Sequence, residues 1–235
     1  MSSSLETVQQ AFSLLLSFDS KVWSIILVSF SVSVRALALC ILPAILAGFV
    51  LAQGRFFGRH FLITLFQTLQ AIPTVVVGLM VYLLLFRQGP LGDLRWLFTQ
   101  EAMMLGQVML ATPVLVSTSY AAFASGDWRA WETARTLGAT KLRAFMTLCH
   151  ELRAPLLVAI VAAFSRIITE VGSSMLVGGN IQNLTRNMPT AIALETSKGE
   201  FAQATALGIV LVALALILNF LLGSLKGRQE HRRNG

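Results

Sequence analysis

Five apolar segments, each long enough to cross a lipid bilayer, divide most of this 235-residue chain: 22–51, 61–86, 103–124, 156–177 and 202–223. Because a helix of about 20 residues crosses the hydrocarbon core, these segments predict about five transmembrane helices. The composition agrees, since 55% of the residues are hydrophobic and 12% are charged, whereas soluble domains carry about a quarter charged residues. We therefore expect an all-α integral membrane protein with one membrane domain over residues 22–223 and no sizeable soluble domain.

The segment before the first span, residues 1–21, has a pattern of its own. Leu5, Val8, Phe12 and Leu15 recur at helical spacing with polar residues between them. Its apolar part is too short to span a bilayer, so the pattern predicts either an amphipathic helix at the membrane surface or an additional packed helix. No basic region precedes a short apolar core, which argues against a cleaved signal peptide.

The distribution of positive charge predicts the orientation in the membrane. Five spans place the two ends of the chain on opposite sides of the membrane. If the polar loop 127–155 is cytoplasmic, the loop after the first span and the C-terminal tail are cytoplasmic as well. The basic residues on the cytoplasmic side are then Arg55, Arg59, Arg129, Arg135, Lys141, Arg143, Arg153, Lys226, Arg228, Arg232 and Arg233. The outer side then holds a smaller set: Lys21, Arg87, Arg95, Arg186 and Lys198. This asymmetry follows the positive-inside rule, so we expect the N-terminus outside and a basic cytoplasmic tail over residues 224–235. The net charge of +7 then requires no nucleic-acid partner.

Several chemistries have no pattern to support them. Cys40 and Cys149 lie in or beside apolar segments without ligand spacing, so neither a disulfide framework nor a metal site is indicated. No phosphate-binding loop of the G-x-x-x-x-G-K-[ST] type occurs. Ser173 and Ser174 have no histidine nearby in the sequence to activate them. We expect no catalytic residues and no cofactor, and if transport is active its energy must come from a partner.

The polar loop 127–155 has the pattern of two short helices joined by a sharp turn. Asp127 can cap a helix that begins at Trp128, because its carboxylate can accept hydrogen bonds from free N–H groups of the first turn. Gly138 after Leu137 predicts the end of that helix, since glycine tolerates the left-handed conformation. A second helix can start after Thr140 and lead into the next span.

Five residues of this loop resemble a known signature. Glu132, Ala134, Gly138, Ala139 and Phe145 have the spacing of the cytoplasmic "EAA loop" of type I ABC importer permeases. The resemblance implies the fold of those permeases and a coupling loop that sits in a cleft of a partner ATPase. The loop departs from the family at His150-Glu151, where Leu-Pro is common.

A second resemblance lies in the fourth span and after it. The stretches EVGSSMLVGGNIQNLTR (170–186) and TAIALETSKGEF (190–201) are similar to the molybdate and tungstate branch of these permeases, most closely to its tungstate-type subunits. Arg166 and Glu170 are four residues apart on one helical face and can neutralise each other. They form either a structural ion pair or, with Gly172, part of the gate of the transport pathway.

The resemblance implies a complex in a bacterial or archaeal cytoplasmic membrane: a homodimer of this chain, two copies of an ABC ATPase and an extracytoplasmic oxyanion-binding protein. The expected cargo is a tetrahedral oxyanion, tungstate first, with molybdate and sulfate as alternatives. Candidate contacts with substrate or binding protein at the outer mouth are Gly178, Gly179, Asn180, Thr185, Arg186 and Thr190. An ATP-independent anion channel or secondary transporter is the competing hypothesis, with Arg166 and Glu170 as its coupling site.

Overall fold

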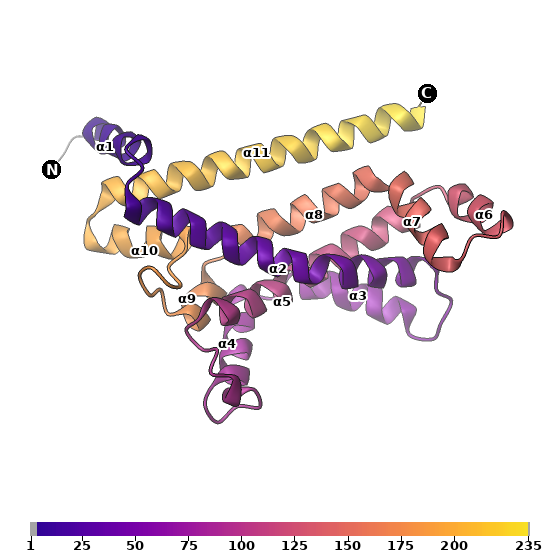
Figure 1. Cartoon of the computed structure of the whole chain (residues 1–235), viewed down its shortest axis with the longest axis horizontal. Coiled ribbons are helices and arrows are strands. Elements are labelled where there is room, and N and C mark those ends of the chain that lie inside the picture. The colour runs from indigo at the N-terminus through magenta and orange to yellow at the C-terminus, as the bar shows by residue number, and fades with distance from the viewer. Residues whose placement is uncertain (1–3, 235) are drawn as a thin grey trace. The chain divides into compact units, whose positions relative to one another are not determined.

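The computed structural model describes residues 4–234, and the side chains of residues 6–224. Residues 1–3 of the predicted N-terminal segment and Gly235 of the predicted tail lie outside that range. The described chain contains helices and no strand, which confirms the all-α prediction. In order, the helices are α1 (Ser4–Leu16), α2 (Ser20–Gln53), α3 (Arg59–Leu69), α4 (Thr74–Leu85), η1 (Gly92–Leu94), α5 (Gln100–Ala124), α6 (Arg129–Thr136), α7 (Lys141–Glu151), α8 (Arg153–Ile168), α9 (Gly172–Gly178), α10 (Met188–Lys198) and α11 (Phe201–Asn234) (Figure 1).

Within the described residues, three continuous helices, α2, α5 and α11, are long and apolar enough to cross a membrane. Two bent pairs, α3–α4 and α8–α9, raise the number to five if each pair is one span. The five predicted segments are therefore all present, but the second and fourth are broken. Pro73 lies at the first break, in the N-cap position of α4. A helix cannot continue easily through this position, because proline has no N–H to donate and its ring disfavours helical backbone in the residue before it. The last span also differs from the prediction, since α11 continues as helix through the basic tail to Asn234.

The chain divides into two compact units, each assembled from three stretches of sequence. Unit 1 comprises Met1–Ala38, Ile72–Ala111 and Phe164–Ile217, and unit 2 comprises Leu39–Ala71, Thr112–Ala163 and Leu218–Gly235. The core of unit 1 includes Val32, Val81, Leu85, Ala102, Met103 and Val177. The core of unit 2 is built around Ala122, Phe123, Leu148, Leu152 and Leu156.

Small residues allow close packing in unit 1. A Cβ added to Gly78 on α4 would lie 2.7 Å from the Cα of Ser173 on α9. One added to Gly106 on α5 would lie 2.4 Å from the Oγ of the same serine. Glycine is therefore required at Gly78, since a side chain there would meet backbone that cannot move without separating α4 from α9. At Gly106 the close atom is a side-chain hydroxyl, which would have to rotate away.

Helix α1 contacts the start of α2, where the indole N–H of Trp23 donates to the carbonyl of Leu15 at 3.3 Å, and α1 is too short to span a bilayer. The carboxylate of Asp19 accepts hydrogen bonds from the N–H groups of Lys21 and Val22, both at 3.0 Å, and so caps α2. The ring of Phe18 stacks on that of Trp23 with centroids 5.0 Å apart. Of the described side chains of α1, only Ala11 is buried. This favours the surface-lying alternative over a helix packed into the core.

The arginine inside the first span has local partners. Arg35 donates to the side-chain carbonyl of Gln100 and, at 3.0 Å, to the backbone carbonyl of Ser31. The amide of Gln100 in turn donates to the carbonyl of Leu184 at 2.8 Å. These contacts lower the cost of a charge within the span and tie α2 and α5 to the loop before α10.

Candidate functional site

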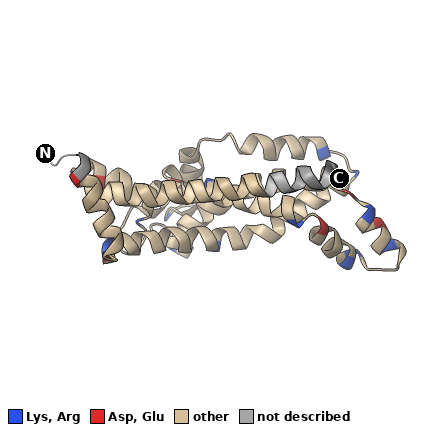
Figure 2. Ribbon diagram, turned by 90° about the horizontal axis from the view of Figure 1, so that it is seen from above, with Lys and Arg blue, Asp and Glu red and all other residues tan. Residues whose placement is uncertain are grey.

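Two short helices, α6 and α7, project together in unit 2 and carry acidic and basic side chains close to one another (Figures 1 and 2). Asp127 accepts a hydrogen bond from the N–H of Arg129 at 2.9 Å and forms an ion pair with its guanidinium at 2.7 Å. The hydrogen bond from the Arg129 side chain lowers the pKa of the Asp127 carboxyl below its ordinary value. The predicted hydrogen bond from the first turn to Asp127 is present, but α6 begins at Arg129, one residue later than expected, and Trp128 occupies the N-cap position without a side-chain capping bond.

The turn between these helices is a Schellman motif. Gly138 has φ of 85°, its N–H donates to the carbonyl of Arg135 at 3.1 Å, and the N–H of Ala139 donates to that of Ala134 at 2.9 Å. Thr140 then caps α7 by accepting from the N–H of Arg143 at 3.3 Å. The signature alanines and glycine thus occupy the positions that fix the turn, which explains their spacing physically.

The outer surface of this turn is apolar. Leu137, Leu142 and Met146 expose 82%, 65% and 53% of their surfaces. Glu132 is also exposed, and within the described residues its side chain makes no hydrogen bond or ion pair. Neighbouring apolar side chains exposed on a charged loop are typical of a protein contact surface.

The signature phenylalanine, also on α7, is half-buried, whereas Leu142 and Met146 are exposed. The ring of Phe145 packs against Phe49 of α2, with centroids 4.8 Å apart and planes at 67°. Phe49 also contacts Phe123, Trp131 and Trp128, at 5.5, 5.3 and 5.9 Å. This aromatic cluster joins α6 and α7 to α2 and α5, so Phe145 holds the turn in place. Sequence reasoning missed the cluster because its members come from separate segments.

The residues that depart from the family pattern, His150 and Glu151, are exposed at the end of α7. Leu152 separates α7 from α8, which starts at Arg153 with Pro155 in its first turn, where a proline is tolerated. Nothing in the structure explains the two polar residues.

The predicted pair in unit 1 is formed at the break between α8 and α9. Arg166 and Glu170 approach to 3.5 Å, and Glu170 is only 3% exposed. The other carboxylate oxygen of Glu170 accepts from the N–H of Ser173 at 3.0 Å. Gly172 lies against α4, where an added Cβ would be 2.7 Å from a methyl group of Val75. The three predicted residues are thus together, and each has a structural role at the break.

Most outer-mouth candidates hold their own loop together. The hydroxyl of Thr185 donates to the carbonyl of Gly178 at 2.5 Å and accepts from the N–H of Ile181 at 2.9 Å. Thr190 completes a capping box with Asn187 at the start of α10. Both threonines are fully buried. Gly179, with φ of 67°, ends α9.

Asn180 and Arg186 retain polar atoms without partners. Asn180 donates to the carbonyl of Thr190 at 3.4 Å, but its buried Oδ1 has no partner among the described residues. Arg186 lies 3.7 Å from Glu195 and donates to the carbonyl of Asn180 at 3.3 Å, while its buried Nε has no partner in that part of the chain.

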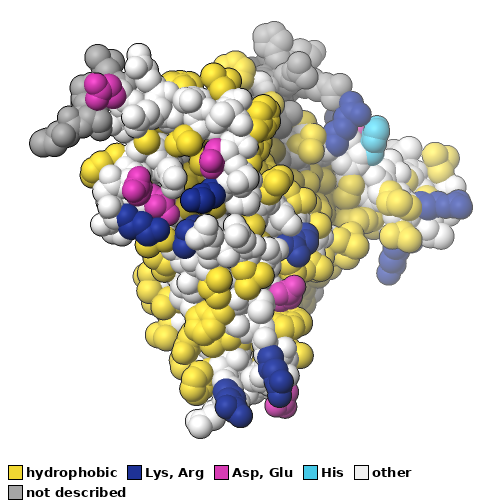
Figure 3. All heavy atoms as spheres, turned by 60° about the vertical axis from the view of Figure 1, so that its left-hand side comes forward, with side chains coloured by type: hydrophobic (Ala, Val, Ile, Leu, Met, Phe, Trp, Pro, Cys, Tyr) yellow, Lys and Arg dark blue, Asp and Glu magenta, His cyan; other side chains and the backbone are white. Residues whose placement is uncertain are grey.

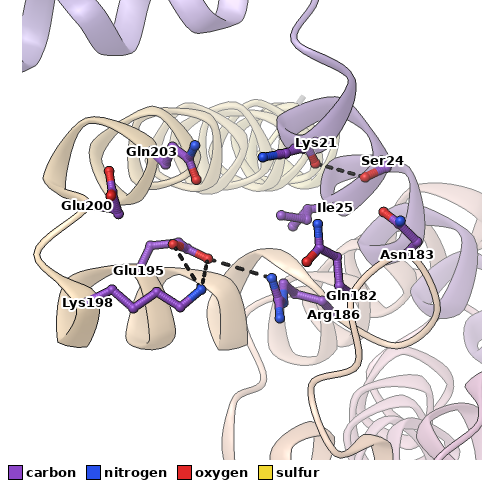
Figure 4. A pocket seen from close by; sticks show the side chains of 10 residues that line it. All are labelled: Lys21, Ser24, Ile25, Gln182, Asn183, Arg186, Glu195, Lys198, Glu200 and Gln203. Carbon is purple, nitrogen blue, oxygen red and sulfur yellow. Dashed lines mark hydrogen bonds and ion pairs between the residues drawn. The ribbon is translucent and has the colours of Figure 1, made fainter.

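Arg186 lies in a pocket of about 250 Å³, the outer pocket, whose lining comes from α2, the loop before α10, α10 itself and the start of α11 (Figure 4). The lining residues are Lys21, Ser24, Ile25, Gln182, Asn183, Arg186, Glu195, Lys198, Glu200 and Gln203. Figure 3, which brings this side of unit 1 forward, shows acidic and basic side chains gathered in one area.

The charges of the outer pocket are only partly paired. Lys198 lies 3.2 Å from the buried carboxylate of Glu195, which also faces Arg186. Lys21 and Glu200 make no ion pair within the described residues. No short-range sequence signal connects Lys21 with residues about 160 positions later, so sequence reasoning found only Arg186.

The family model for the inner membrane component of binding-protein-dependent transport systems matches residues 44–234 of this chain. The chain belongs to this family. The match covers both the α6–α7 turn and the loop that contributes to the outer pocket, and it confirms the resemblance inferred from the sequence.

Two tungstate permeases are among the relatives of this transport-system component. It is 36% identical to the tungstate uptake system permease protein TupB of Peptoclostridium acidaminophilum over 94% of this chain and 97% of the relative. It is 39% identical to the corresponding protein of Campylobacter jejuni over 72% of this chain and 70% of the relative. The molybdenum transport system permease protein ModB of Escherichia coli K12 is 29% identical, over 83% of this chain and 89% of the relative.

Membership of this family places the apolar helices in a membrane. The chain is a multi-pass inner membrane component of an ABC-type importer, and such components move a substrate across the membrane rather than transform it. Within the described residues no group of three or more His, Cys, Asp or Glu side chains could hold a metal ion.

Proposed function

We propose that this chain is the membrane-spanning subunit of an ATP-driven importer for tetrahedral oxyanions, with tungstate as its main substrate. Two copies would form one pathway, two copies of a cytoplasmic ABC ATPase would supply energy, and an extracytoplasmic binding protein would deliver the anion. The proposal combines family membership with the geometry of the α6–α7 turn.

One observation carries the ATPase assignment. The turn has a rigid backbone, an aromatic base and an exposed apolar surface at Leu137, Leu142 and Met146. A soluble loop would not need such a surface, whereas a coupling loop needs apolar contact with its partner and a rigid connection to the spans.

The orientation follows from the charges. With the α6–α7 turn on the cytoplasmic side, five spans place the C-terminal tail in the cytoplasm and the N-terminus outside. The outer pocket then faces outward, and Lys21, Arg186 and Glu200 are available to the binding protein. Gly178, Gly179, Thr185 and Thr190 would support that surface from within, because their polar groups are already used or buried.

The mechanism we propose is alternating access. ATP binding would draw the two ATPases together and move the docked α6–α7 turns, and the aromatic cluster would transmit this motion to α2 and α5. Arg166, Glu170 and Gly172 lie at the break between α8 and α9, where a change in helix packing could open or close a gate.

Tungstate is favoured over molybdate and sulfate by the relatives. Over the aligned residues the tungstate permeases are 36% and 39% identical to this chain, against 29% for the molybdenum permease. These anions have the same shape and charge, so we expect the binding protein to provide most of the discrimination.

The ATPase assignment is tested by placing a charge on the exposed surface of the turn. Leu137→Asp and Leu142→Asp should reduce co-purification of the cognate ATPase about tenfold or more, because each buries a carboxylate in an apolar contact. Leu94→Asp is the matched control, since Leu94 is an exposed leucine in the loop before α5. Full ATPase retention and normal uptake in both turn variants would refute the assignment.

A further inference from the structure

A second pocket, here called the arginine pocket, lies in unit 2 where α2 ends and the chain turns into α3. It has a volume of about 260 Å³ and is lined by Ala52, Gln53, Gly54, Arg55, Arg59 and Trp128. None of these lining residues, all within the described part of the chain, is acidic. A pocket with two guanidinium groups and no carboxylate selects an anionic ligand.

One of the two arginines is held in place before any ligand arrives. The Nε of Arg59 donates to the carbonyl of Leu51 at 2.6 Å, and its guanidinium lies over the ring of Tyr120 at 5.9 Å from the centroid. Because these contacts fix the side chain, little conformational entropy is lost when its other N–H groups bind an anion.

The second arginine is available, and the backbone beside it is shaped by glycine. Arg55 is exposed, and within the described residues its side chain makes no hydrogen bond or ion pair. An added Cβ at Gly54 would lie 2.6 Å from the carbonyl oxygen of Val50, so only glycine allows the chain to turn this closely. The turn brings Arg55 to the same pocket as Arg59.

Exposed aromatic side chains lie close in sequence to the two arginines of the pocket. Phe57 is fully exposed and Phe56 is 41% exposed in the turn between α2 and α3, and Phe61, in the first turn of α3, is 69% exposed. Exposed aromatic rings beside arginines at the end of a spanning helix are typical of the level at which lipid headgroups lie. A ligand with a phosphate head and an apolar tail could bind both the arginines and the exposed phenylalanine rings.

We propose that the arginine pocket binds the phosphate of an anionic phospholipid, with Arg55 and Arg59 on the phosphate and Phe57 and Phe61 against the acyl chains. Trp128, on the wall of the pocket, directly precedes α6 and stacks on Phe49 of the aromatic cluster. A bound lipid would thus contact the base of the α6–α7 turn. This site depends on neither the transported anion nor ATP.

The purified full-length chain in detergent provides the test, with native mass spectrometry to measure retention of dioleoylphosphatidylglycerol and dioleoylphosphatidylcholine. Wild type should prefer phosphatidylglycerol, and Arg55→Gln should weaken its binding about fivefold, the effect of removing one basic residue near an anionic headgroup. Since the exposed side chain of Arg55 makes no hydrogen bond or ion pair within the described residues, this variant should fold normally. Arg59→Lys, which keeps the charge but loses the planar donor fork, should weaken binding to a smaller extent. Arg87→Gln, at another exposed arginine, is the matched control and should bind as wild type.

Three results would overturn the proposal. The first is equal retention of the two lipids by wild type. The second is an unchanged preference for phosphatidylglycerol in the double variant that carries both Arg55→Gln and Arg59→Lys. The third is displacement of phosphatidylglycerol by millimolar glycerol phosphate, which would make a free phosphate the ligand. If the double variant keeps its lipid preference but loses the ATPase, the pocket receives an acidic side chain of that partner, and the lipid assignment is wrong.

Discussion

Gly138 shows how one residue determines the shape of the proposed coupling surface. An added Cβ there would meet nothing within 4 Å, so the requirement for glycine comes from its φ of 85° rather than from space. Left-handed backbone costs a residue with a side chain roughly 1–2 kcal/mol. A residue with a side chain at position 138 would avoid this strain by changing the backbone of the turn. Such a change would displace the neighbouring residues Leu137 and Ala139.

Gly138→Val should therefore leave the spans folded and reduce ATPase co-purification and substrate uptake together. Gly199→Val is the matched control, because Gly199 has φ of 82° at the end of α10, and an added Cβ there is also free of contacts. Both variants carry similar backbone strain, so equal ATPase retention in the two would show that Gly138 has no special role in docking.

The same region provides a prediction about pH. Burial raises the pKa of the Cys149 thiol to about 11, and the thiolate is the reactive form. Roughly one thiol in a thousand is then ionised at pH 8, and this fraction rises about tenfold with each pH unit until the pH nears 11. Maleimide should label Cys149 far more slowly at pH 8 than a cysteine introduced by Leu137→Cys. Equal labelling rates would contradict the packing that surrounds Cys149.

Residue patterns predicted the local features of the site and missed its long-range ones. The glycine turn and the pairing of Arg166 with Glu170 depend on residues close in sequence, and both are present. Thr185 and Thr190 were expected to be exposed at the outer end of the pathway, but their hydroxyls are buried. The sequence does not show whether a polar side chain in a loop hydrogen-bonds within that loop or remains available to a ligand. The contribution of Lys21 to the outer pocket arises only from tertiary packing.

At the scale of the elements, α4 packs closely against α9, and this contact depends on Gly78. Gly78→Ala should destabilise the protein by about 1–3 kcal/mol, because its Cβ would overlap the backbone of Ser173. Gly208→Ala on α11 is the control, since an added Cβ there has no neighbour within 4 Å. Thermal unfolding in detergent distinguishes them, and equal midpoints would contradict the packing described.

Hydrophobicity predicted where the spans lie but not that two are broken. The sequence of the second segment is compatible with a continuous helix except at Pro73. The sequence of the fourth segment gives no sign of a break, because Arg166 can also neutralise Glu170 in an unbroken helix. In the structure Glu170 also accepts from the N–H of Ser173, a contact that requires the helix to stop and restart. Such breaks depend on tertiary contacts that no window of hydropathy contains.

For the whole molecule, the positive-inside distribution predicts that the η1 loop and the α6–α7 turn lie on opposite sides of the membrane. In intact cells, a membrane-impermeant maleimide should label Leu94→Cys but label Leu137→Cys only after permeabilisation. The reverse pattern would invert the proposed orientation and move the outer pocket to the cytoplasm.

Uptake by the reconstituted complex tests the central claim most directly. Proteoliposomes containing this chain and its ATPase, supplied with the binding protein outside and ATP inside, should accumulate tungstate, and excess sulfate should compete poorly. Uptake should be lost when either ATP or the ATPase is omitted. Tungstate accumulation that continues without ATP and without the ATPase would contradict the account and establish the chain as an independent channel or secondary transporter.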